Sequence, residues 1–136
     1  MKAVIADRFE MPWRVGVQPD PTPGPNDVLV QIEASGVCYT DVHQLNNPAY
    51  GGTFPRIPGH EPIGRVVARG DSVQEISEGE RVGVAYAQRW CGNCAYCSLG
   101  RYEHCPEISA TGIAVDGGYA ELAVMDAASV ERVPEA

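Results

Sequence analysis

The sequence of 136 residues is long enough for one modest hydrophobic core but too short for two full domains. Hydrophobic residues make up 44% of it, as in folded globular proteins, and the formal net charge is −8. This acidic balance argues against nucleic acid or an anionic membrane as a partner, because either would require a basic face.

The N-terminal residues and the number of cysteines indicate the cellular compartment in which the protein is expected. Charged residues appear at Asp7 and Arg8, so residues 1–6 are not expected to act as a signal peptide, and no apolar stretch approaches the length needed to cross a membrane. The chain has five cysteines, an odd number. Without a secretory signal, that count favours metal ligation in a reducing cytoplasm over a disulfide framework.

The predicted elements are mostly short strands separated by turns. Prolines crowd residues 19–25 and cannot pair within a central sheet, so this stretch is expected to be an extended connection. A short helix is predicted over residues 40–45 with Thr40 or Asp41 as its N-cap, followed by a loop over 46–58. Regular strand spacing indicates an all-β barrel or sandwich. The strands are expected over residues 4–6, 13–17, 28–34, 63–67, 80–85 and, as the last one, 119–125, with turns at Gly79-Glu80 and Gly117-Gly118.

The sequence contains no Gly-x-Gly-x-x-Gly motif and no alternation of strands with long amphipathic helices. Both features are typical of a dinucleotide-binding Rossmann domain. We therefore expect that no such domain lies within residues 1–136.

A cluster of four cysteines occupies a stretch predicted to form a lobe at about residues 88–107. A structural zinc ion takes a closed tetrahedral shell of thiolates, and closely spaced Cys-x-x-Cys pairs are typical of such sites. A redox pair would leave two of the cysteines unexplained. An iron–sulfur cluster satisfies the ligand count, but nothing nearby suggests an electron-transfer partner. The predicted ligands of a structural zinc are Cys91, Cys94, Cys97 and Cys105.

A second candidate site combines the remaining cysteine, Cys38, with His60 and Glu61. A catalytic zinc site uses about three protein ligands and leaves one position open. Each residue taken alone has an ordinary structural explanation, since a buried cysteine is common in cores and a single histidine is usually a packed or surface residue. Spacing alone leaves both interpretations open.

Taken together, these motifs resemble one family. The stretch GVCYTDVH at residues 36–43, GHEPIG at 59–64, the four-cysteine lobe, and AVDGGYAE at 114–121 match in order and spacing. The chain resembles, over essentially its whole length, the N-terminal catalytic domain of zinc-dependent medium-chain alcohol dehydrogenases. It looks closest to the bacterial and yeast type that acts on small primary alcohols.

The resemblance implies a mainly β, GroES-like, partly open barrel with short helices. It also implies that Cys38 and His60 are ligands of a catalytic zinc, and that Glu61 is a carboxylate able to approach or replace a ligand. By the same resemblance, Asp41 orients the ligand histidine. A bound zinc would stabilise the alkoxide form of an alcohol near neutral pH.

Further roles follow from the same resemblance. Thr40 would take the alcohol proton and His43 would pass it towards solvent through the cofactor ribose, although from the residues alone Thr40 could simply cap a helix and His43 lie exposed on it. Tyr39 stands where relatives usually carry His or Arg against the cofactor pyrophosphate, so it lacks their positive charge. Tyr86 stands where an aromatic residue often lines the substrate pocket.

Family members continue into a Rossmann domain that binds NAD(P), and the catalytic zinc takes its third protein ligand just past residue 136. The sequence is therefore expected to form an isolated catalytic domain over residues 1–136, with its structural zinc held well and its catalytic zinc held weakly. The expected partners are a small alcohol or aldehyde and a Rossmann domain, with a homo-oligomer left open. Two alternatives are a standalone zinc-stabilised barrel for binding or assembly, and a reductase of aldehydes or activated double bonds. Relatives of the quinone-reductase kind usually lack both zinc sets, so the five cysteines argue against the reductase.

Overall fold

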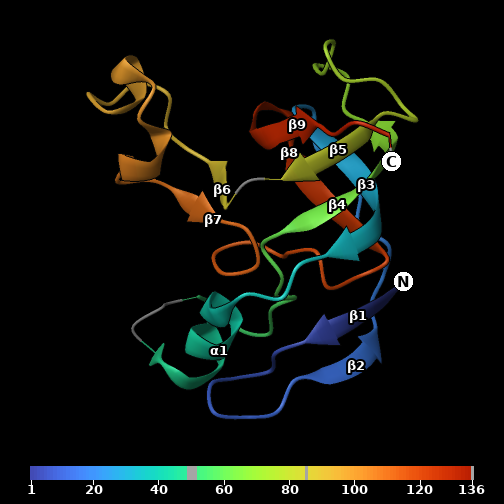
Figure 1. Ribbon diagram of the computed structural model, residues 1–136, viewed down its shortest axis with the longest axis vertical. Helices are drawn as coiled ribbons and strands as arrows, with labels where there is room; N and C mark the ends of the chain where they lie inside the picture. Colours follow the sequence, from blue (N-terminus) through green and yellow to red (C-terminus); the bar gives the residue numbers. More distant parts are fainter. Residues whose placement is uncertain (49–51, 85, 136) are drawn as a thin grey trace.

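The computed structural model describes residues 1–48, 52–84 and 86–135, and its architecture is mainly β (Figure 1). The described residues contain one α-helix, α1 (Tyr39–Asn46), and three short 3₁₀ helices, η2 (Cys97–Leu99), η3 (Tyr102–His104) and η4 (Ala127–Ser129). The strands are β1 (Lys2–Ile5), β2 (Arg14–Val17), β3 (Asp27–Ser35), β4 (Pro62–Arg69), β5 (Arg81–Val84), β6 (Ala87–Arg89), β7 (Ser109–Ala110), β8 (Leu122–Asp126) and β9 (Val130–Arg132).

A five-stranded antiparallel sheet with the order β8-β3-β4-β5-β9 forms the body of the molecule. Strand β3 lies inside this sheet, between β8 and β4, and its alternating apolar residues place Val28 and Val30 on the covered face. Residues from the sheet and from the β4–β5 connection bury the main hydrophobic core. Its members are Val28, Val30, Val66, Val73, Ile76, Val82, Ala123, Met125 and Val130.

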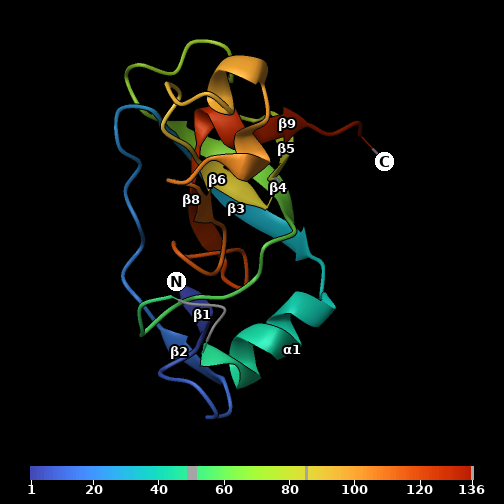
Figure 2. The same ribbon diagram turned by 90° about the vertical axis from the view of Figure 1, so that its left-hand side faces the viewer.

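The β1–β2 hairpin forms a second, smaller body at the opposite end of the molecule from β5 and β9 (Figure 1). Ala3, Ile5 and Ile57 make a small core there, with Tyr119 packed against it. Helix α1 lies beside this hairpin, and a ninety-degree turn of the view separates the two clearly (Figure 2). The cysteine-rich lobe projects from the sheet on the β6–β7 pair.

Most predicted strands are found, with shifted bounds. The predicted last strand starts late, because Ala120 bridges to Ala3 of β1 and only residues from Leu122 onward pair with β3. That strand is also not the last one, because β9 follows and pairs with β5. The predicted strand over 80–85 is β5, and its predicted end, Ala85, lies outside the described residues. The β6 and β7 pair was not predicted, since two or three residues carry no readable alternation.

The prediction of Thr40 or Asp41 as the N-cap of the helix was wrong. The N-cap is Cys38, whose sulfur accepts a hydrogen bond from the Thr40 N–H at 3.5 Å, and the Asp41 carboxylate accepts one from the Cys38 N–H at 2.9 Å. Cysteine is not among the residues preferred at N-caps, so propensity favoured its neighbours. Asp41 instead occupies the third helical position, where a carboxylate completes a capping box.

The two predicted turns have different outcomes. The turn at Gly79-Glu80 is confirmed: Gly79 has φ +87° and the Glu80 N–H donates to Ser77 O at 3.2 Å. Residues Gly117 and Gly118 instead run alongside the chain that precedes His60, donating to Ile57 O and Gly59 O. A Cβ at Gly117 would lie 2.1 Å from Gly59 O, so close approach explains the glycine there.

The predicted loop over 46–58 begins one residue later, because Asn46 ends α1. Residues 49–51 of it lie outside the described part of the chain. Within the described part, no helix is long and apolar enough to cross a membrane.

Candidate metal centres

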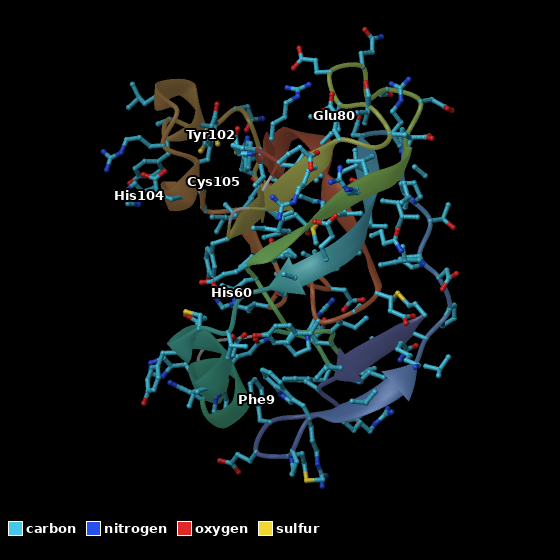
Figure 3. The ribbon with its side chains drawn as sticks, turned by 45° about the vertical axis from the view of Figure 1, so that its right-hand side comes forward. Phe9, His60, Glu80, Tyr102, His104 and Cys105 are labelled. Atoms are coloured by element: carbon cyan, nitrogen blue, oxygen red, sulfur yellow. The ribbon has the colours of Figure 1, made fainter. Side chains whose placement is uncertain are left out.

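The four lobe cysteines converge on one point. Their sulfur atoms all lie within 4.8 Å of one another, although the residues span a whole excursion of the chain between β6 and β7. Cys97 opens η2 and Cys105 follows η3, so the two short helices turn their sulfurs inward. Figure 3 shows the lobe, with Cys105, Tyr102 and His104 labelled, standing apart from the sheet.

The surroundings of two lobe cysteines shift their pKa values in opposite directions. The Cys97 N–H donates to the Cys94 sulfur at 3.5 Å, and this bond lowers the pKa of Cys94 to about 7. Burial acts in the opposite direction at Cys97, raising the pKa of that thiol to about 12. Four cysteine sulfurs this close together are the donor set that a structural divalent cation takes, with each cysteine bound as a thiolate. The donor set therefore fits a tetrahedral zinc ion.

Aromatic and charged side chains cover the outside of the lobe. The rings of Trp90 and Tyr102 stack with their centroids 4.5 Å apart. The Arg101 guanidinium lies 2.9 Å from a ring nitrogen of His104. These contacts brace a segment that buries few apolar side chains, so the sulfur cluster is its main organising feature.

The second candidate centre is assembled from two distant segments. Ligand atoms of Cys38, His60 and Glu61 lie within 4.8 Å of one another. Cys38 comes from the start of α1, while His60 and Glu61 come from the residues just before β4. His60 lies between α1 and the central sheet (Figure 3). Gly59 turns the chain into this position with φ +93°, a conformation that other residues rarely adopt.

The His60 ring is held between two carboxylates. Its Nδ1 lies 3.5 Å from Asp41 Oδ1, and its Nε2 lies 3.9 Å from Glu61 Oε1. Both Nδ1 and Asp41 Oδ1 are buried and have no hydrogen-bond partner among the described residues. A proton on Nδ1 would face Asp41 and leave the Nε2 lone pair towards Cys38 and Glu61, which is the tautomer that a metal ligand requires. The sulfur, imidazole and carboxylate donors also fit zinc.

The other predicted site residues divide into two groups. Thr40 Oγ1 lies 3.5 Å from the Cys38 sulfur, and the Tyr86 ring centroid lies 6.0 Å from that of His60, so both are next to the candidate centre. Tyr39 and His43 form the second group: Tyr39 is the first residue of α1 and His43 lies one turn later, with their rings edge-to-face at 4.8 Å. Tyr39 is 70% exposed, so its phenol is available to a partner outside this chain.

An open groove runs from the candidate centre along the edge of the sheet. It has a volume of about 500 Å³ and is mostly apolar in its lining. His60 and Glu61 lie at one end of it, and Tyr86 forms part of its wall together with Ile63 and Val84. A small organic molecule entering the groove would therefore reach the open side of the candidate centre.

Sequence reasoning missed one residue of this region. The Tyr119 hydroxyl lies 2.8 Å from Asp41 Oδ2 and 3.0 Å from Gly36 O. Burial, followed by the hydrogen bond to Asp41, raises the pKa of Tyr119, so the phenol keeps its proton at neutral pH. The only sequence signal for this contact is the glycine pair before Tyr119, and glycine pairs usually predict a turn.

Residues 24–135 match the alcohol dehydrogenase GroES-like domain. The chain belongs to this family. The family's mainly β, partly open barrel agrees with the sheets described above, so the predicted fold class is confirmed.

Similar proteins include several dehydrogenases. An alcohol dehydrogenase from Moraxella sp. (strain TAE123) is 36% identical over 136 residues, covering 99% of this chain and 40% of the relative. The cobalt- and zinc-bound thermostable alcohol dehydrogenase from Pyrobaculum aerophilum has a TM-score of 0.89 and 30% identity, covering 100% of this chain and 42% of that structure. A short chain alcohol dehydrogenase from Escherichia coli CFT073, complexed with NADH, has a TM-score of 0.89 and 31% identity, covering 99% of this chain and 39% of that structure. The GroES-like chain thus spans about two fifths of the length of the relatives it matches.

Proposed function

We propose that this chain is the zinc-binding catalytic domain of an alcohol dehydrogenase, which oxidises a small alcohol to an aldehyde or ketone and transfers hydride to NAD(P). The observation that carries the proposal is the convergence of Cys38, His60 and Glu61 within 4.8 Å, with the Thr40 hydroxyl beside them. A purely structural module has no use for an open ligand set next to a proton acceptor.

The proposed division of labour follows the positions of the side chains. Cys38 and His60 hold a catalytic zinc, Glu61 lies where it can approach or replace a ligand, and Asp41 fixes the His60 tautomer. When bound, the zinc supplies the Lewis acidity that favours the alkoxide form of the alcohol. Thr40 Oγ1 accepts the alcohol proton.

From Thr40 the proton must reach solvent. His43 lies one helical turn further along α1, and an imidazole can both accept and donate a proton, so we assign it the next step of the relay. Tyr86 and the apolar groove beside His60 would hold the carbon end of the alcohol. A groove of this size suits a small alcohol or aldehyde substrate.

The proposed structural zinc and the proposed cofactor domain both lie outside the catalytic centre. The lobe at about residues 88–107 holds a structural zinc on Cys91, Cys94, Cys97 and Cys105. NAD(P) would come from a Rossmann domain, in keeping with the NADH complex of one structural neighbour and with the share of its relatives that the chain spans. Tyr39, exposed at the start of α1, would meet the cofactor with its phenol.

The proposed compartment is the cytoplasm, because two thiolate-bearing sites require reduced cysteines. The described cysteines form no disulfide, as this proposal expects. We leave the domain free to work within a homo-oligomer.

The first test is the zinc content of the purified protein before and after a mild chelator. About two zinc ions per chain, one of them easily lost, would support both sites. One resistant ion would mean that residues 1–136 form a folded scaffold whose active site is completed only in the full enzyme. Activity that stayed absent after joining a nucleotide domain would then favour the alternative function, a zinc-stabilised barrel used for binding or assembly. A protein without zinc would refute the assignment of the lobe as well.

A further inference from the structure

The candidate catalytic centre has a buried support that the proposed function does not use. The Tyr119 hydroxyl lies 2.8 Å from Asp41 Oδ2, on the opposite side of that carboxylate from His60. We propose that Tyr119 is a positioning residue, which orients Asp41 so that this carboxylate in turn sets the ring and tautomer of His60 for metal binding. The inference rests on the proposed function, since it concerns the same metal centre.

The contacts of Asp41 explain why it needs a second partner. Oδ2 accepts hydrogen bonds from the Cys38 N–H at 2.9 Å and from Tyr119 at 2.8 Å. Two donors on one oxygen define the plane of the carboxylate, and the other oxygen, Oδ1, is then directed at His60 Nδ1. Without the phenol, the carboxylate would keep only the bond to the helix N-terminus and could rotate about its Cβ–Cγ bond.

The position of Tyr119 is itself strongly determined. Its N–H donates to Pro58 O at 3.0 Å, and its carbonyl oxygen accepts from the Val4 N–H at 2.8 Å. Its ring lies over Gly59, where a Cβ would come within 2.6 Å of the ring, and its centroid is 6.1 Å from that of Trp13. Tyr119 therefore joins the β1–β2 body and the chain before His60 to the first turn of α1.

This arrangement places the hydroxyl on a rigid base. The hydroxyl also lies 3.0 Å from Gly36 O, but an ionised carboxylate is the stronger acceptor, so the proton is directed to Asp41. The chain Tyr119–Asp41–His60 thus runs from the small hydrophobic core to the candidate ligand. Outer partners of this kind commonly change metal affinity by about 10- to 100-fold when removed.

The test is a titration of the purified protein with Co²⁺, after loading the lobe with zinc and removing weakly held metal. Co²⁺ bound to Cys38 and His60 gives sulfur-to-metal and visible absorption bands, so affinity and ligand geometry are read together. Tyr119→Phe should raise the Co²⁺ dissociation constant about tenfold and alter the visible bands, while one zinc per chain stays in the lobe. Tyr102→Phe is the matched control, because it removes a phenol that stacks on Trp90 in the lobe, and it should leave the titration unchanged.

A double-mutant cycle distinguishes a positioning role of Tyr119 from a general loss of structure around the metal centre. Asp41→Asn should weaken Co²⁺ binding by a similar factor, and adding Tyr119→Phe to it should have little further effect, because the two act in one chain. Independent, multiplicative effects would overturn the inference. An unchanged dissociation constant in Tyr119→Phe would also overturn it and would leave the proposed function intact.

Two other outcomes are also decisive. If the unaltered protein binds no Co²⁺ outside the lobe, the proposed function and this inference fail together. If Tyr119→Phe does not fold, 3-fluorotyrosine at position 119 replaces it, since the ring and hydroxyl are kept. Its ¹⁹F resonance should then move when Zn²⁺ fills the second site, and a resonance that does not move would refute the coupling.

Discussion

The two candidate metal centres are built in opposite ways. The lobe takes all four ligands from one short stretch, Cys91 to Cys105, and its chain packs little against the rest of the molecule. The Cys38/His60/Glu61 centre takes its ligands from the two ends of a long connection, and its side chains are positioned by α1, β4 and Tyr119. In the lobe a bound metal would organise the chain, whereas at the second centre the fold already brings the candidate ligands together.

The largest effect should come from removing one lobe ligand. Cys97→Ser should release the lobe zinc and unfold the lobe, lowering the free energy of unfolding by about 4 kcal/mol, because metal binding there is coupled to folding. Zinc analysis and thermal denaturation measure this. Cys38→Ser is the comparison, and it should keep the lobe zinc. Unchanged metal content and thermal stability in Cys97→Ser would contradict the contrast between the two centres.

A smaller effect on stability is expected at the second centre. His60→Ala should remove the easily lost zinc and abolish alcohol oxidation in the complete enzyme, while one zinc per chain remains in the lobe. The cost in stability should be about 1–2 kcal/mol, since the fold does not depend on that ion. Near-normal turnover in this variant would rule out His60 as a ligand.

The fold around the second centre can be disturbed without touching a ligand. Gly59→Ala places a Cβ within 2.6 Å of the Tyr119 ring at a residue with φ +93°, so it should destabilise the protein by about 2 kcal/mol. It should also weaken metal binding at the second centre and leave the lobe intact. Gly92→Ala is a matched control: it also has a positive φ, +74°, but nothing lies near its Cβ. Equal losses of second-site metal in both variants would show that backbone strain alone is responsible.

The smallest effect concerns an exposed ion pair on the sheet. Arg65 donates two hydrogen bonds to Glu135, at 3.0 and 2.6 Å, and this guanidinium lowers the pKa of the Glu135 carboxyl. A lowered folded-state pKa contributes stability above the unfolded value, roughly 4.3, and the contribution is lost as pH falls through the lowered pKa. Glu135→Gln should therefore melt slightly below the unaltered protein at pH 6, and the difference should shrink as the pH falls through the lowered pKa. A difference that persisted in acid would exclude this pair as its source.

The two centres also differ in how much of each could be predicted from the sequence. The four lobe cysteines are neighbours in the chain, so spacing alone indicated a shared site, and their sulfurs indeed converge. Cys38 and His60 are far apart in sequence, so spacing alone left their shared site open, and the resemblance of the surrounding motifs favoured it. Their convergence in space now stands independently of that resemblance.

The errors lie where tertiary contacts override local preference. Cys38 caps α1 although cysteine is a poor cap by propensity, because its sulfur faces the Thr40 N–H. The chain at Ala120 pairs first with β1 and only then with β3, so the last predicted strand began too early. Neither of these two contacts produces a recognisable pattern in the sequence of the neighbouring residues.

By itself the sequence determined the element types, the lobe and the candidate ligands, since each depends on residue chemistry and short-range spacing. Only the tertiary structure decided which oxygen of Asp41 faces His60 and which phenol faces Asp41. Hydrogen bonds between buried groups depend on distances of tenths of an ångström and on the packing of several elements at once. Tyr119 therefore becomes part of the site only when β1, α1 and the chain before His60 come together.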